Sequence, residues 1–150
     1  MNKKEEILAE HRNIVNLVKR LIFNSHCAHV EDKLTPANGQ IIGYLYHNQN
    51  RDIFQKNIEE EFSIRRSTVS KTLRLMEEKD YIRRESVDGD ARLRKISLTP
   101  KALRIADFIE SDMQKLQDIA FNGISDSDLE VIFRVAVKVR ENIENALGSH

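Results

Sequence analysis

The 150-residue sequence is poor in several residue types that whole fold classes require. It contains five Gly, two Pro and no Trp, too few turn-forming residues to connect the many short strands of an all-β sandwich or barrel. Its single cysteine, Cys27, excludes an internal disulfide bond and favours a cytoplasmic location. The composition therefore predicts one mainly α-helical domain.

Long apolar runs and enzyme motifs are also absent from the sequence. The most apolar run extends only from Ile41 to Tyr46, whereas a bilayer-spanning helix needs about 20 residues, and Met1 to Glu6 lacks the apolar segment of a secretory signal. There is no Gly-rich phosphate loop, no His-Glu-x2-His and no Gly-x-Ser-x-Gly. We therefore expect no membrane partner, no enzymatic activity and no cofactor.

The charge is balanced overall but unevenly distributed along the chain. The 24 Lys and Arg residues equal the 24 Asp and Glu residues in number. Between Asp52 and Phe62, four acidic residues accompany only Lys56, whereas the segment from Arg65 to Leu75 has four basic residues and no acidic one. Because a polyanion responds to local charge, the second segment is the better candidate for a binding surface.

The spacing of apolar residues predicts the secondary structure. Helices are expected over residues 4–30, 36–48, 56–62, 64–79, 100–123 and 125–147, with a short strand at 52–54. Thr35 and Thr99, each followed by proline, are expected N-caps, as are Ser63 and Ser125. From Tyr81 the period changes, and residues 81–87 and 94–98 predict a β-hairpin around the Asp- and Gly-rich turn 88–90.

The helix over 64–79 has the composition of a nucleic-acid reader. With Val69, Leu73 and Met76 turned inward, its exposed face carries small hydroxyl groups between cations. Short Ser and Thr side chains allow a helix to approach a groove floor, and Arg and Lys bond base edges or phosphates. The predicted DNA-binding residues of this helix are Arg65, Arg66, Ser67, Thr68, Ser70, Lys71 and Arg74.

The predicted hairpin supplies a second basic element. Arg92, Arg94 and Lys95 follow its turn, and a narrow minor groove attracts an inserted arginine. Asp90 is expected to hold the Arg92 guanidinium by a bidentate bond. A basic helix followed directly by a basic hairpin is typical of a winged helix-turn-helix.

Three segments carry a resemblance to a known family. They read Leu34-Thr35-x4-Gln40-Ile41-x3-Leu45, then Ser67-Thr68-Val69-Ser70-x2-Leu73-x2-Met76-Glu77, then Asp90-x-Arg92-x5-Leu98-Thr99. In this order and spacing they resemble the signatures of the MarR family of bacterial transcription regulators, over nearly the whole chain. Where that family often has Gly, this sequence has Asp80 and Ala102, and both residues are compatible with the same fold.

The resemblance implies a single domain over residues 1–150, mainly α with a small β-hairpin wing. Residues 35–98 would form the winged-helix DNA-binding module, and residues 1–34 and 99–150 the long dimerisation helices. The recognition helix would include Arg65 to Arg74, and Arg92 would lie at the wing tip. Such proteins are usually homodimeric repressors that bind palindromic double-stranded DNA and release it when a small-molecule inducer, an oxidant or a metal acts on the dimer.

Other interpretations remain open at this point. His26, Cys27 and His29 are candidate metal ligands, and Cys27 is the one candidate for an oxidant switch. Four aromatic residues either line a ligand pocket or belong to the core: Phe23, Tyr44, Tyr46 and Phe108. A helical protein-binding adaptor would explain the long terminal helices, but it would not explain the basic helix followed by a basic hairpin.

Overall fold

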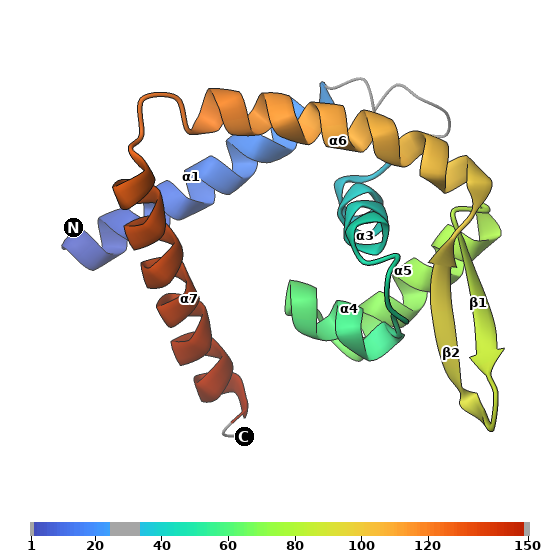
Figure 1. Cartoon of the computed structure of the whole chain (residues 1–150). Helices are drawn as coiled ribbons and strands as arrows, with labels where there is room; N and C mark the ends of the chain where they lie inside the picture. The colour runs from blue at the N-terminus through green and yellow to red at the C-terminus, as the bar shows by residue number, and fades with distance from the viewer. Residues whose placement is uncertain (1, 25–33, 149–150) are drawn as a thin grey trace. The chain divides into compact units, whose positions relative to one another are not determined.

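A computed structural model describes residues 2–24 and 34–148 of the chain. In chain order the elements are α1 (Lys3–Phe23), α3 (Pro36–His47), α4 (Gln55–Phe62), α5 (Arg66–Glu78), β1 (Ile82–Val87), β2 (Asp90–Leu98), α6 (Pro100–Ala120) and α7 (Asp126–Gly148) (Figure 1). They fall into two compact units, Met1–Leu116 and Gln117–His150. The predicted mainly helical fold with one small hairpin is confirmed.

Within the described ranges, no helix combines the length and apolarity needed to cross a membrane.

Helix α1 begins with a reciprocal cap. The Asn2 side chain accepts a hydrogen bond from the Glu5 N–H (3.0 Å), and the Glu5 carboxylate accepts one from the Asn2 N–H (2.8 Å). The helix ends at Phe23, and the Asn24 N–H donates to the Arg20 carbonyl. The remainder of the helix predicted over 4–30 falls mainly on residues outside those described.

Helix α3 begins and ends close to the predicted positions. The Thr35 hydroxyl accepts a hydrogen bond from the Asn38 N–H (3.2 Å), and Pro36 occupies the first turn. Tyr44 is half-buried and meets Phe62 of α4 edge-on, with ring centroids 5.8 Å apart. At its far end, His47 lies 2.8 Å from a Glu110 oxygen of α6.

The hydrophobic core of the first unit lies where α3, α4, α5, the hairpin and the first turns of α6 meet. It is built from fully or nearly fully buried side chains: Ile41, Ile42, Leu45, Ile53, Ile58, Val69, Leu73, Met76, Tyr81, Ile82, Ile96, Ala102, Ile105, Ala106 and Ile109. Every one of these elements contributes to a single core. The candidate DNA-binding helix and the hairpin are therefore packed on the same hydrophobic core.

The connection between α4 and α5 differs from the sequence prediction. Ser63 was expected to cap the following helix, but it adopts the left-handed conformation (φ 51°) that ends α4, and the Ile64 N–H bonds to the Glu59 carbonyl (3.1 Å). Helix α5 then begins at Arg66, with Arg65 at the N-cap position. The backbone bond that ends α4 thus displaces the start of α5 by two residues.

Helix α5 ends in a Schellman motif at Asp80. The Tyr81 N–H donates to the Met76 carbonyl (2.9 Å), and the Asp80 N–H donates to the Glu77 carbonyl (3.0 Å). Asp80 has φ 59°, a conformation that Asp adopts more readily than most residues other than Gly. The expectation that Asp80 tolerates a left-handed cap is confirmed.

The hairpin pairs β1 with β2 in antiparallel register, from Ile82 opposite Leu98 to Ser86 opposite Arg94. A further bridge joins Ile53 to Ile96, and the Ile96 N–H donates to the Ile53 carbonyl (2.8 Å). This bridge matches the short strand expected at 52–54. It attaches the middle of β2 to the segment before α4.

The Thr99 hydroxyl caps the N-terminus of α6 and also bonds the turn that precedes β1. It accepts a hydrogen bond from the Ala102 N–H (3.2 Å) and donates to the Asp80 carbonyl (2.6 Å). In the second unit, the Ser125 hydroxyl accepts a bond from the Asp128 N–H (3.2 Å) at the start of α7. Both predicted caps are confirmed.

Candidate nucleic-acid interface

Helix α5 has one buried face and one cationic face, as its periodicity predicts. Val69, Leu73 and Met76 are at most 1% exposed and hold the helix against the core. The seven predicted DNA-binding residues of this segment are all exposed: Arg65, Arg66, Ser67, Thr68, Ser70, Lys71 and Arg74. The face contains two hydroxyl-bearing serines between the cations, which allows the backbone to approach a ligand closely.

The N-terminus of α5 has no side-chain cap. Arg65 occupies the N-cap position but its side chain makes no cap hydrogen bond. Helix N-termini carry a partial positive charge and backbone N–H groups that favour anions. Arg65 and Arg66 are exposed at the same end, so backbone and side-chain groups of the first turn present positive potential together.

Arg92 lies in an irregular part of the hairpin. Ser86 pairs with Arg94 but the next residue, Val87, pairs with Asp90, so the residues from Ala91 to Leu93 have no partners on β1. Such a bulge re-aims the side chains that it carries. Arg92 is exposed there, as its predicted position at the wing tip requires.

Asp90 does not hold the Arg92 guanidinium in the way that the sequence suggested. Its carboxylate accepts a hydrogen bond from the backbone N–H of Arg92 (2.9 Å). Asp side chains readily bond backbone amides two residues ahead in turns, and this local bond forms in place of the predicted bidentate pair. Asp90 therefore shapes the backbone that carries Arg92.

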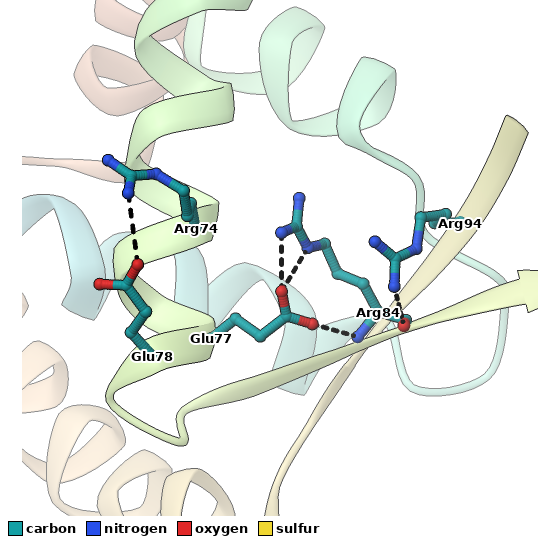
Figure 2. Close-up of polar contacts among 5 residues, drawn as sticks. All are labelled: Arg74, Glu77, Glu78, Arg84 and Arg94. Atoms are coloured by element: carbon teal, nitrogen blue, oxygen red, sulfur yellow. Dashed lines mark hydrogen bonds and ion pairs between the residues drawn. The ribbon is translucent and has the colours of Figure 1, made fainter.

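Glu77 joins the end of α5 to β1 through Arg84 (Figure 2). One Glu77 oxygen accepts two bonds from the Arg84 guanidinium, from Nη2 at 2.7 Å and from Nε at 3.0 Å, and the other accepts the backbone N–H of Arg84 at 3.3 Å. The Arg84 side chain is only 19% exposed. These bonds to Arg84 hold the pKa of the Glu77 carboxyl below its ordinary value.

The two other predicted hairpin cations are held by neighbouring groups. Arg94 donates from Nη2 to the Arg84 carbonyl at 2.9 Å. Lys95 places Nζ 2.7 Å from an Asp52 oxygen, and this hydrogen bond raises the pKa of Lys95. Both side chains are exposed, so they differ from Arg92 in being pre-oriented by the protein.

Sequence reasoning missed Glu77 and Asp52 as the residues that organise the hairpin. Glu77 lies seven residues from Arg84 across a turn, and Asp52 bonds a lysine on the far strand of the hairpin. No periodic pattern connects these positions. Two weak signals were available for Glu77: it is the last residue of the second segment that resembles the MarR family, and with Glu78 it is the first acid to follow the cationic stretch of α5.

The candidate metal- and oxidant-sensing residues cannot be placed in this structure. His26, Cys27 and His29 lie outside the described residues. Across residues 2–24 and 34–148, no group of three or more His, Cys, Asp or Glu side chains is arranged to hold a metal ion.

Comparison with known proteins agrees with this geometry. Residues 32–93 match the family model of the MarR family. The crystal structure of the transcription regulator MarR from Oenococcus oeni PSU-1 is 27% identical in sequence, with a TM-score of 0.77, and the match covers 93% of this chain and 99% of that chain.

Two further similar structures were solved with DNA. The MepR–DNA complex of S. aureus is 23% identical, with a TM-score of 0.77 and coverage of 90% of this chain and 96% of that chain. FabT of Streptococcus pneumoniae in complex with DNA is 18% identical, with a TM-score of 0.68 and coverage of 95% of each chain. These two likenesses establish the fold. The module that contains α5 thus matches the MarR family of transcription regulators, and the Oenococcus oeni regulator is similar to this chain over nearly its whole length.

Proposed function

We propose that this protein is a homodimeric repressor that binds palindromic double-stranded DNA and releases it when a small ligand binds the dimer. The observation that carries the proposal is the exposed cationic face of α5 beside a basic hairpin that is bonded to the same helix. The MepR and FabT structures, which contain DNA, support double-stranded DNA as the partner. A regulator of this kind acts in the cytoplasm.

The proposed contacts divide between the two elements. Ser67, Ser70 and the neighbouring cations of α5 enter the major groove, where hydroxyl and guanidinium groups reach base edges. Arg92 enters the flanking minor groove, with Arg94 and Lys95 near the backbone. We call α5 and the hairpin of one chain a DNA-binding head. In a dimer, the two heads bind half-sites about one helical turn apart.

Exposed apolar surface supports the homodimer. Five large apolar residues of α1 are at least 41% exposed in the single chain: Ile7, Leu8, Ile14, Leu17 and Leu21. Helix α7 has no buried residue, although its sequence has an apolar stripe. Apolar faces of this extent mark an interaction surface, and a second copy of the same chain is the partner that the family favours.

Ligand control follows from the dimer. The spacing of the two heads depends on how the terminal helices of two chains meet. A ligand that binds better to a dimer with the wrong spacing shifts the population away from the DNA-bound state, because only differential affinity moves such an equilibrium. We propose a small molecule as that ligand.

The test is fluorescence anisotropy with a random-sequence duplex across a salt series, with the molar mass measured in parallel by light scattering. We expect a dimer whose log affinity falls linearly with log salt, with a slope equivalent to several phosphates. No detectable affinity at low salt would reject the proposal and favour the protein-binding adaptor. DNA binding that appears only when zinc is added would instead identify a metal sensor of the same fold.

A further inference from the structure

We propose that Glu77 is a positioning residue that fixes the hairpin against α5 through Arg84, so that recognition helix and hairpin bind DNA as one rigid head. The inference rests on the proposed DNA-binding function. It adds a residue that does not itself contact DNA but that determines how well the hairpin contacts DNA. Its basis is the set of three hydrogen bonds that the Glu77 carboxylate accepts from Arg84.

The contact fixes both the position and the direction of β1. The Arg84 backbone N–H and its guanidinium bond different oxygens of the same Glu77 carboxylate. A contact to the side chain alone would leave the strand free to pivot about a long flexible arm. The backbone bond removes that freedom, because it ties the peptide group of β1 itself to the last turns of α5.

The same contact extends to the second strand. The carbonyl of Arg84 accepts the bond from Arg94 Nη2 (Figure 2), so a shift of Arg84 also moves the acceptor of a predicted DNA-contacting cation. On β2, Lys95 is held separately by Asp52. Glu85 and Lys95 are cross-strand partners, so both attachments lie at the same level of the hairpin, with the bulge and Arg92 beyond them.

Charge alone predicts the opposite effect of removing Glu77. A carboxylate close to a DNA-binding surface repels phosphates, and its loss would also release the Arg84 guanidinium to attract them. Electrostatics therefore predicts that Glu77→Gln tightens DNA binding. The positioning role predicts that it weakens binding, because the released hairpin must be ordered when the complex forms.

The neighbouring residue provides a matched control. Glu78 also lies on α5, and it pairs with Arg74 of the same helix at 3.3 Å. Glu78→Gln removes the same charge one residue away without releasing the hairpin. We expect DNA binding by this variant to be unchanged or tighter.

The first experiment measures affinity for a duplex selected from a random library for tight binding to the unmodified protein. We expect Glu77→Gln to weaken binding about tenfold. Arg84→Lys, which conserves every charge but loses the guanidinium geometry, should weaken binding in the same direction. Binding by both variants that equals or exceeds that of Glu78→Gln would overturn the proposal.

The second experiment is a double-mutant cycle with Arg92→Ala. If Glu77 acts through the hairpin, Glu77→Gln should weaken DNA binding less when Arg92 is already replaced by alanine. The effects of Glu77→Gln and Ser70→Ala on the binding free energy should instead be additive. An additive cycle with Arg92→Ala would reject positioning of the hairpin. If the unmodified protein bound no DNA at all, the proposed function would fail before this test is reached.

A readout without DNA keeps the inference testable if a variant is less stable. Amide hydrogen exchange of the free protein should accelerate across residues 84–94 in Glu77→Gln and Arg84→Lys, with protection of α5 retained. The core beneath α5 and the Lys95–Asp52 pair remain in both variants. Unchanged exchange in the hairpin, or equal acceleration across the whole module, would contradict a local positioning role.

Discussion

Glu77 and Glu78 are adjacent residues of one type with different roles. Glu77 is 35% exposed and bonds Arg84 across elements, whereas Glu78 is 57% exposed and pairs with Arg74 within its own helix. Exposed pairs within a helix contribute only about 0.3–0.5 kcal/mol. The sequence places both residues at the end of a basic helix, but only the turn at Asp80 and the direction of β1 decide which of them meets Arg84.

The lowered pKa of Glu77 gives the stability of the protein a pH dependence. Because the folded state holds this carboxyl's pKa below its ordinary value near 4.5, the ionised form stabilises the fold above that pH, and the contribution is lost as the pH falls through the lowered value. Glu77→Gln should therefore be less stable than the unmodified protein at pH 7, with the difference shrinking toward pH 3. Urea unfolding at several pH values measures it, and a constant difference would contradict the assignment.

Lys71 lies on the exposed face of α5, and we expect it to contact a phosphate. Lys71→Ala should weaken binding to all duplex sequences about equally and reduce the slope of log affinity against log salt by about one. Lys115→Ala, a change of the same kind at an exposed position on α6, is the control and should leave the slope unchanged. An unaltered slope for Lys71→Ala would remove Lys71 from the interface.

Helix termini separate the features that local sequence determines from those that it does not. Thr35 and Thr99 were predicted as caps because each precedes a proline, and in the structure each accepts a bond from the amide three residues ahead. Ser63 has a suitable side chain, but the backbone needs it to end α4. A serine between two helices close in sequence can serve either one, and tertiary packing makes the choice.

Thr99 also joins two elements, so its replacement should cost more than the loss of a cap. Thr99 is 1% exposed, and its hydroxyl bonds both the Ala102 N–H and the Asp80 carbonyl. Thr99→Val keeps the shape and should reduce the free energy of unfolding by roughly 2–3 kcal/mol, since the Ala102 N–H loses its partner in the buried interior and the Asp80 carbonyl loses one at a partly buried site. Thr35→Val, at an exposed cap, should cost about 1 kcal/mol. Equal losses in urea unfolding would show that the bond to Asp80 contributes nothing.

At the scale of the molecule, the sequence predicted the order of elements and the cationic face of α5, because both follow from short-range periodicity. It did not predict the contacts that fix the hairpin. Lys95 meets Asp52, and Arg84 meets Glu77, where the packing of several elements on the common core brings distant segments together. Non-local pairs of this kind depend on tertiary geometry that one sequence does not express.

The single chain leaves large apolar side chains of α7 exposed. Phe133 of α7 is 73% exposed, and in a protein that functioned as a single chain, Phe133→Glu would change stability by about 0.5 kcal/mol at most. If α7 packs against a second copy, the same change places a charge in an apolar interface, where an unpaired carboxylate is strongly unfavourable. We therefore expect Phe133→Glu to dissociate the dimer at micromolar concentration in sedimentation equilibrium. Arg134→Glu, at the adjacent exposed position, should remain dimeric.

The dissociated variant should also lose DNA affinity, although the substitution lies outside the proposed contact surface. A palindrome is bound tightly because two linked heads engage two half-sites, so a single head retains only its own weaker affinity. The loss should be larger on a palindromic duplex than on one half-site, where both proteins bind through one head. A Phe133→Glu protein that stays dimeric would show that this face of α7 is not needed for dimerisation. A variant that dissociates but binds the palindrome unchanged would show that tight DNA binding does not depend on the dimer.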